Sequence, residues 1–283
     1  MYTFSLQNSQ ALSFNSLSQY NLQSTETQAS VVGYTVAAWV YPTSQNGIII
    51  SDRGSGTGDG LILGIGNVLL CGGMPGSFFF GVNSNGVGLG SNTIWQYPMN
   101  RWYFVAGTFN APTGSSISSS DFNLYINGVF SVGSSWCNIH STNVKAPLTG
   151  SGGMYIGTNA PFTTSQGGIP FNGLLSNMQV YNSVLSSQQI YHLYQEGIEG
   201  VPISNAMLLG WYPLNGNLND YSGNGYTVTS QIPANFVLLP GYVRDGILTA
   251  NASQYSFRFP SKGYQPNSIV FDIGTPPIPS WYR

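Results

Sequence analysis

Charged residues are scarce in this sequence. Only 6% of its 283 residues are Asp, Glu, Lys or Arg, with 7 basic against 9 acidic side chains, whereas soluble domains typically carry about 25%. So few basic residues cannot build the face that neutralises nucleic-acid phosphates or an anionic lipid surface. Nucleic-acid binding and electrostatic membrane binding are therefore excluded. Gly, Ser, Asn, Gln, Thr and Tyr supply the polarity, and such a neutral surface changes little with pH, which favours an exterior location.

Long apolar runs and a leader sequence are also missing. No stretch of about 18 apolar residues occurs, so the sequence predicts no membrane span. Met1 is not followed by a basic and then apolar segment, which would mark a secretory signal. We expect a soluble extracellular protein of a cell or virion surface, whose leader has been removed or which leaves by another route, such as lysis.

Cysteine is limited to Cys71 and Cys137. Neither has a second Cys or a His at metal-ligand spacing, so metal binding by these thiols is not expected. An exterior location permits a disulfide between them, and two buried free thiols remain the alternative. Asn251 begins the tripeptide Asn-Ala-Ser, which is either an N-glycosylation site or a chance match.

What the sequence does contain is a succession of short β-branched and aromatic segments separated by Gly, Pro, Asn and Ser. This pattern predicts an all-β sandwich. One helix is expected, because Ser186 is a good N-cap, Ile190 and Leu193 share a face, and Gly197 is a stop signal. The segments 112–120 and 133–153 are expected to be loops. The expected strands are 35–41, 47–51, 61–65, 78–82, 101–108, 122–126, 129–132, 154–157 and 171–181.

Five ordered motifs give this pattern a family resemblance. The motifs lie at 34–42, 100–108, 123–128, 156–159 and 171–186. Together they resemble a laminin-G-like domain of the concanavalin A-like lectin and glucanase superfamily. The resemblance implies a two-sheet antiparallel jelly-roll with one short helix.

The opening segment of that family stands in an unexpected place. In the family, a Trp/Tyr-Pro-Leu-Asn-Gly strand and an Asp-x-Ser-Gly-x-Gly turn come first, whereas here they occur at 208–226. Residues 247–255 then echo 11–20, which is an internal partial repeat. We therefore expect a jelly-roll at 1–200 that lacks its opening strand, a linker at 201–207, an opening segment at 208–260 and a Pro-rich extended tail at 261–283.

A sandwich without its opening strand exposes a sheet edge and part of its core. The segment 208–260 is therefore expected to pack as β-strands on a jelly-roll, with Trp211 and Leu214 buried. The acceptor is either the same chain or a neighbouring copy, in which case strand addition assembles the copies.

Catalytic residues are not expected. Glycosidases of the resembled superfamily place a Glu and an Asp on one strand, so that both carboxylates face the cleft. The three glutamates, Glu26, Glu196 and Glu199, do not lie on a core strand beside another carboxylate. His140 and His192 have no fitting Ser or Cys motif for a triad. The sequence therefore predicts a protein that is not an enzyme.

Calcium is the one cofactor for which the sequence has candidates. Asp220 precedes a Gly-rich turn whose carbonyl groups could converge on Ca²⁺. The alternative is an Asx turn made by the same carboxylate. Asp52 and Asp59 flank a second Gly-rich turn, which is either a weaker calcium site or a solvated hairpin.

Aromatic residues in predicted loops are the candidates for sugar binding. These are Trp95, Tyr97, Trp136 and Phe162, because an aromatic face stacks on a sugar ring while nearby Asn or Gln binds its hydroxyls. The alternative is that they pack down on the sandwich, as Trp39, Trp102 and Trp211 are expected to do. We expect a structural or adhesion protein built on this sandwich, with copies of itself, surface proteins or glycans as partners; the alternative is a soluble lectin.

Overall fold

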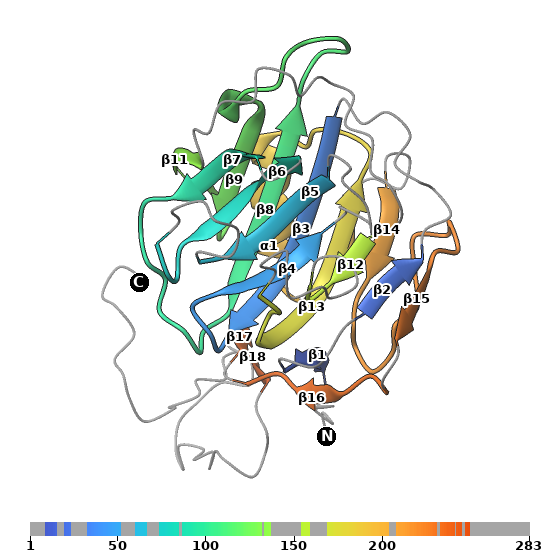
Figure 1. Ribbon diagram of the computed structural model, residues 1–283. Coiled ribbons are helices and arrows are strands. Elements are labelled where there is room, and N and C mark those ends of the chain that lie inside the picture. The colour runs from blue at the N-terminus through green and yellow to red at the C-terminus, as the bar shows by residue number, and fades with distance from the viewer. Residues whose placement is uncertain are drawn as a thin grey trace, which may run out of the picture. The chain divides into compact units, whose positions relative to one another are not determined.

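The structure is a computed structural model, and it describes residues 9–15, 20–23, 33–51, 60–66, 74–84, 87–131, 133–136, 154–158, 169–203, 208–230, 233–240, 242–244 and 247–249. The chain divides into two compact units. One unit comprises residues 10–237, and the other comprises residues 1–9 and 238–283. The larger unit carries both sheets of a sandwich (Figure 1).

The first sheet, sheet A, has the strand order β10-β9-β8-β3-β13-β1-β16, and β14 also pairs with β13. Every pairing given for these strands is antiparallel, and the longest ladder joins β3 to β8 and β13. The bounds are β1 Gln10–Phe14, β3 Gly33–Pro42, β8 Tyr103–Asn110, β9 Phe122–Ile126, β10 Val129–Phe130, β13 Gly173–Tyr181, β14 Leu208–Tyr212 and β16 Phe236–Leu238.

The second sheet, sheet B, has the order β11-β7-β6-β5-β4-β12-β2-β15. Its strands are also antiparallel, and β4 to β7 follow one another as neighbours in the sheet. The bounds are β2 Tyr20–Gln23, β4 Gly47–Ser51, β5 Gly60–Ile65, β6 Phe78–Ser84, β7 Val87–Thr93, β11 Gly133–Trp136, β12 Met154–Ile156 and β15 Thr227–Ser230.

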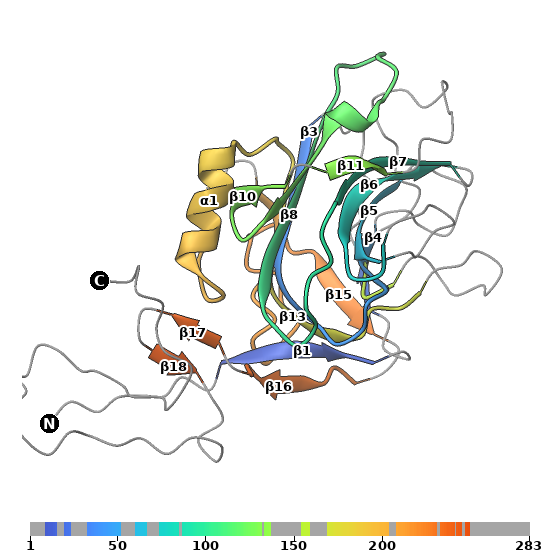
Figure 2. The ribbon, with the colours of Figure 1, turned by 90° about the vertical axis from the view of Figure 1, so that its left-hand side faces the viewer.

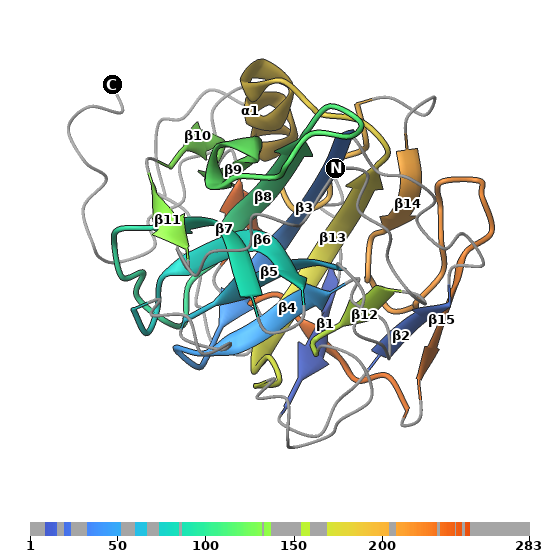
Figure 3. The same cartoon turned by 45° about the horizontal axis from the view of Figure 1, so that its top comes forward.

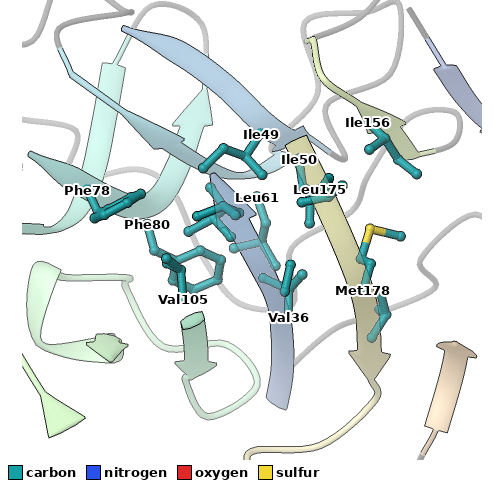
Figure 4. Close-up of a cluster of buried hydrophobic side chains, with 14 of the residues drawn as sticks. Val36, Ile49, Ile50, Leu61, Phe78, Phe80, Val105, Ile156, Leu175 and Met178 are labelled. Atoms are coloured by element: carbon teal, nitrogen blue, oxygen red, sulfur yellow. The ribbon is translucent and has the colours of Figure 1, made fainter. Parts of the chain in front are cut away.

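The main core lies between the sheets. Alternate residues of each strand point into it, which is the period-2 pattern of a strand with one face on a core. Figure 4 shows Leu61, Phe78 and Phe80 from sheet B facing Val36 and Val105 from sheet A. Gly107 leaves room for the ring of Phe80, because a Cβ atom on residue 107 would lie 2.3 Å from that ring.

A single helix, α1 (Ser187–Glu196), covers the outer face of sheet A (Figure 2). Ser186 and Gln189 form a capping box at its start, and Gly197 ends it with φ +81°. The ring of Trp39 stacks on Tyr194 at 5.8 Å. The outward side chains of β3 are thus buried as well, which explains why this strand shows no polar alternation.

The C-terminal strands divide between the two units. β14 pairs with β13 and β15 pairs with β2, so residues 208–230 extend both sheets of the larger unit (Figure 3). β17 (Tyr242–Arg244) and β18 (Ile247–Thr249) pair with each other in a two-stranded sheet. β18, the copy of the β1 motif, thus pairs with β17, and the packing of residues 239–260 on a sandwich stays a prediction.

The two-sheet jelly-roll and its short helix confirm the fold class expected from the sequence. The predicted Asn127-Gly128 hairpin is also confirmed, with φ values of +51° and +75° that suit a type I′ turn. One expected loop is wrong in part, because residues 133–136 form β11 on the edge of sheet B. Within the described residues, none of the helical segments combines the length and apolar character that crossing a bilayer requires.

Candidate functional site

Three loops meet at one end of the sandwich, where β3, β6 and β8 have their ends. We call residues 42–46, 74–77 and 94–101 the three-loop surface. Backbone hydrogen bonds join the loops: Gly76 N donates to Gln45 O, Tyr97 N to Gly76 O, and Asn100 N to Pro42 O, each at 2.8 Å. Gly76 has φ +80° and Asn100 φ +59°, conformations that Gly and Asn adopt more readily than other residues. The loops therefore form one connected surface.

Trp95 is the most exposed large hydrophobic side chain of the described residues, at 67%. Its neighbour Ile94 is 43% exposed. The backbone beneath them is fixed, because Thr93 Oγ1 donates to Trp95 O at 3.1 Å and accepts from Phe78 N at 3.0 Å. The other described tryptophan side chains differ, since Trp39 is buried and Trp102 and Trp211 are half-buried. An exposed indole on a fixed backbone is a ready stacking surface.

Tyr97 lies in the same loop but turns toward the core. Its ring packs against Phe78 at 5.2 Å and Tyr103 at 5.3 Å. Burial raises the pKa of Tyr97 above 10.0, against the smaller effect of its hydrogen bond with Ser131. The hydroxyl of Tyr103 in turn donates to Pro98 O at 2.7 Å. Tyr97 thus anchors the loop that presents Trp95, and its ring is only partly exposed.

The exposed side chains that share the three-loop surface with Trp95 are a mixture of neutral polar and apolar groups. Three exposed amides, those of Gln45, Gln96 and Asn100, belong to the three-loop surface, and Arg101 is its one charged residue. Sequence reasoning did not single out these four as site residues, because their neighbourhood depends on hydrogen bonds between loops far apart in the chain. The exposed side chains of the surface are Thr43, Gln45, Met74, Pro75, Ile94, Trp95, Gln96, Pro98, Asn100 and Arg101.

Of the two remaining aromatic candidates, the structure describes only the backbone position of Trp136. Trp136 is the last residue of β11 and lies opposite Gly90 of β7. Thr93, where β7 leads into the Trp95 loop, is three residues further on, about 10 Å along the strand. Phe162 lies outside the described residues. Trp95 is therefore the one aromatic candidate whose exposed side chain the structure displays.

Asp220 organises a turn. Its Oδ1 accepts hydrogen bonds from Trp211 N at 3.1 Å and Ser222 N at 2.8 Å. Its Oδ2 accepts from the Ser222 hydroxyl at 2.8 Å and Tyr226 N at 3.1 Å. The bond from Ser222 N is an Asx turn, the alternative to calcium that the sequence left open. All four partners are donors, so they compete with a cation for the carboxylate lone pairs.

No group of three or more His, Cys, Asp or Glu side chains suited to a metal occurs among the residues that the structure describes. Asp52 and Asp59, the other calcium candidates, lie outside those residues. The same holds for Cys71, Cys137, Asn251 and Glu26. Of the remaining acidic candidates, Glu196 forms an exposed i,i+4 pair with His192 on α1, at 3.8 Å between Oε1 and Nε2. Such a surface pair contributes little stability.

Trp211 and Leu214, the predicted assembly residues, have different surroundings. Leu214 is fully buried in the main core, with φ +57°. Trp211 is only half-buried, so the expectation of a buried indole is wrong in degree. Because Trp211 alternates with the inward-facing Tyr212, its ring lies on the other face of the sheet. There its Nε1 donates to Asn177 Oδ1 at 2.9 Å.

Asn177 is the centre of a buried polar network. It is 4% exposed, and its Nδ2 donates to Gly200 O at 2.8 Å. Gln179 Nε2 donates to Asn177 Oδ1 at 3.1 Å, and the Tyr181 hydroxyl donates to Gln179 Oε1 at 2.6 Å. The network joins β13, the segment after α1, and β14. A buried network with these groups satisfied fixes one arrangement of the elements that it joins.

Comparison with known proteins agrees with this fold. The chain belongs to the concanavalin A-like lectin/glucanases superfamily, whose laminin-G model matches residues 14–191, more than half of the chain. The family resemblance seen in the sequence is thereby confirmed. A comparison with curated proteins gives no match.

Two solved structures show the same architecture. A "putative carbohydrate binding protein" from Bacteroides ovatus is 20% identical with a TM-score of 0.59, and the match covers 82% of this chain and 60% of that protein. A heptameric SAP-like pentraxin from Limulus polyphemus is 15% identical with a TM-score of 0.51, over 83% of this chain and 97% of the pentraxin. At these identities the likeness concerns the fold alone. The match thus spans three fifths of the Bacteroides protein.

Proposed function

We propose that the protein is a non-catalytic glycan-binding module and that Trp95 on the three-loop surface is its stacking residue. The observation that carries the proposal is the 67% exposure of the Trp95 side chain on a hydrogen-bonded backbone. Exposing an indole to water is unfavourable, since a buried aromatic side chain contributes a large hydrophobic stabilisation. A ligand with an apolar face would cover it.

The neighbouring side chains favour a neutral sugar. The C–H face of a hexose stacks on an indole, and its hydroxyls hydrogen-bond to amides such as those of Gln45, Gln96 and Asn100. Arg101 is the only charged residue of the surface, so a neutral sugar is the first expectation, and a preference for acidic sugars would instead indicate that the Arg101 guanidinium binds a carboxylate. Because an open surface buries less of a ligand than a pocket does, we expect weak affinity for a single sugar and stronger binding to multivalent glycans.

The superfamily supports binding as the class of function, and the Bacteroides protein is described as carbohydrate binding. The absence of an enzyme function remains part of the proposal. We propose this absence for two reasons. Glu196 lies on α1 and pairs there with His192, and the sequence places no pair of carboxylates on one strand. The neutral composition is consistent with attachment to glycans at a cell or virion surface, which we include in the proposal.

A glycan array followed by titration calorimetry tests this function. Neutral and sialylated glycans are compared first, and the best ligand is then titrated into Trp95→Ala. We expect the variant to lose at least about tenfold in affinity, which corresponds to about 1.4 kcal/mol of stacking, while its Tm stays unchanged. Val129→Ala is the matched control, because Val129 is 63% exposed on β10, outside the three-loop surface. Equal affinity of Trp95→Ala and the native chain would refute the site.

A further inference from the structure

Residues 208–230, which we call the hook, fill a place in the sandwich beside the beginning of β1. The outer edge of β13 is shared by two strands: Gly173 to Leu175 pair with β1, and Met178 to Tyr181 pair with β14. β1 is also joined to the hook just beyond β14, where Gln10 N donates to Asn215 Oδ1 at 2.8 Å. About 200 residues of chain separate these two partners in sequence. The hook therefore occupies the place of a segment that would precede β1.

The hook completes the core of the body, by which we mean residues 10–203. Tyr212 and Leu214 are both 0% exposed and belong to the main core cluster. On the other sheet, β15 pairs with β2 over four residues. Removing the hook would uncover apolar core and leave the edges of β13 and β2 unpaired, which is unfavourable. The body is thus an acceptor that needs a hook.

The contacts within the hook are separate from those that dock it. Inside the hook, Asn224 Nδ2 donates to Leu208 O at 2.9 Å and Tyr221 N donates to Trp211 O at 2.8 Å. The Ser222 hydroxyl donates to Leu209 O at 3.1 Å, and the four bonds of Asp220 also stay within the hook. Each of these bonds joins two residues of the hook, so none of them involves the body.

A second set of contacts docks the hook on the body. Pro213 O accepts from Asn177 N at 3.0 Å and from the Ser176 hydroxyl at 3.2 Å. Trp211 Nε1 donates to Asn177, and the β14–β13 and β15–β2 ladders complete the set. None of these contacts depends on the chain that joins the body to the hook. The same set can form whether the hook comes from the same chain or from another copy.

We propose that the hook is exchangeable, so that the hook of one copy docks on the body of another and links copies head to tail. Only residues 204–207 separate the hook from its own body in sequence, and so short a connection gives the hook an effective concentration of roughly millimolar. Closed monomers therefore predominate in dilute solution, and exchange increases when copies are crowded. Because donor and acceptor are different surfaces, the interface is heterologous and yields open chains or rings.

Cysteine crosslinking between different copies tests the exchange. In a background of Cys71→Ser and Cys137→Ser, Asn21→Cys on β2 and Thr229→Cys on β15 stand directly opposite in register. The two single-cysteine proteins are mixed at about 1 mM, unfolded in urea, refolded together and oxidised. We expect a disulfide-linked dimer in this mixture at several times the amount in a control mixture of Thr229→Cys with Val129→Cys, a residue exposed on the other sheet. An amount equal to the control would overturn the proposal.

A second measurement uses the unaltered chain, in case the cysteine background does not fold. A fluorescent peptide of residues 205–232, at about 1 mM so that it matches the tethered hook, is unfolded and refolded together with the native protein, and uptake is followed by size-exclusion chromatography. We expect uptake of this peptide and none of a peptide carrying Trp211→Ala and Leu214→Asp. Absence of uptake, or equal uptake of both peptides, would overturn the exchange. Neither readout involves a glycan, so the result is independent of the proposed function.

Discussion

Asn177 is the single residue on which the arrangement of β13, β14 and the segment after α1 depends. Replacing it with Ala leaves the Trp211 indole N–H, the Gln179 amide and the Gly200 carbonyl without this partner. Buried groups left unpaired each cost about 1–3 kcal/mol. We expect Asn177→Ala to lower the free energy of unfolding by roughly 2–4 kcal/mol in urea titrations.

Asn177→Gly separates the contribution of the lost side chain to stability from that of backbone strain. Asn177 has φ +46°, a conformation that Gly adopts without strain and Ala does not. Asn177→Gly should therefore be about 1 kcal/mol less destabilising than Asn177→Ala. If both variants lose less than about 1 kcal/mol, the network does not hold β14 in place.

Asp220 gives a second test at the residue scale, which distinguishes a hydrogen-bonded turn from a calcium site. Its carboxylate accepts four hydrogen bonds within the hook. We expect Asp220→Ala to lower the Tm by several degrees, corresponding to roughly 2 kcal/mol, whereas EDTA leaves the Tm of the native chain almost unchanged. A drop beyond about 10 °C with EDTA, reversed by Ca²⁺, would instead indicate a calcium site, because ligand linkage of several kcal/mol is then required.

Single residues were predictable where their chemistry is local. The Asx turn at Asp220 depends on the two residues that follow it, and the cap at Ser186 depends on Gln189, so both can be inferred from short patterns. The role of Asn177 could not be predicted, since its partners lie 23 and 34 residues away. Because both residues lie in a predicted loop, Trp95 and Tyr97 were equally good candidates for sugar binding. Only packing distinguishes the exposed indole from the anchored phenol.

At the scale of elements, the β9–β10 hairpin and α1 depend on each other through Gly128. A Cβ atom on Gly128 would lie 2.9 Å from Tyr191 Cδ2 and 3.0 Å from Tyr194 Cβ. Gly128 also has φ +75°, so Gly128→Ala adds backbone strain of about 1–2 kcal/mol to a steric clash with the helix. We expect a total loss of roughly 2–4 kcal/mol in chemical denaturation, since overpacking typically costs 1–3 kcal/mol.

Gly114→Ala is the matched control for this substitution. Gly114 has φ +81°, and a Cβ atom there would meet nothing within 4 Å. This variant therefore shows the effect of the backbone strain alone, and the difference between the two variants measures the contact with α1. If both variants lose the same free energy of unfolding, α1 moves away from residue 128 without an energetic penalty.

Strands with a strong local signal were predictable, and the exception is informative. Residues 122–126 and 129–130 surround an Asn-Gly turn, which specifies a hairpin by backbone conformation alone. Residues 133–136, Gly-Ser-Ser-Trp, have little β-branched character and resemble a loop. They form β11 because the edge of β7 offers unpaired backbone groups. Tertiary context decided this element, and local propensity could not.

For the whole molecule, the sequence predicted the jelly-roll, because ordered motifs specify a superfamily, whereas the identity of 208–226 as its displaced opening segment stays a prediction. The sequence did not indicate which chain the segment docks on, because the same residues would be buried in either case. The sequence also did not show that β14 and β15 join the two sheets, whereas β18, which repeats the β1 motif, pairs with β17. A repeat in sequence specifies similar strands, whereas the available edges determine where those strands pair.

The response of the whole molecule to pH should be one-sided, because charged residues are few and buried tyrosines are many. Burial raises the tyrosine pKa above the ordinary 10.0 at several positions. The folded state therefore keeps phenol protons that the unfolded state releases, so stability is fully present below pH 10 and decreases above it. Urea titrations should give a nearly constant free energy of unfolding from about pH 6 to 9 and a steep decrease above about pH 10. The residues concerned are Tyr97, Tyr103, Tyr125, Tyr155, Tyr181 and Tyr212.

Tyr212→Phe identifies the contribution of one of these residues. Burial, and secondarily the negative charge of Asp220, raises the pKa of Tyr212. Its buried hydroxyl has no hydrogen-bond partner among the described residues. Removing that hydroxyl should stabilise the protein by about 1 kcal/mol at neutral pH and make the alkaline decrease less steep. Tyr191→Phe is the control, because Tyr191 is 46% exposed, and its profile should follow that of the native chain. A Tyr212→Phe variant that is destabilised at pH 7 would show that the hydroxyl has a partner, and that the interior beneath the hook is more polar than its residues indicate.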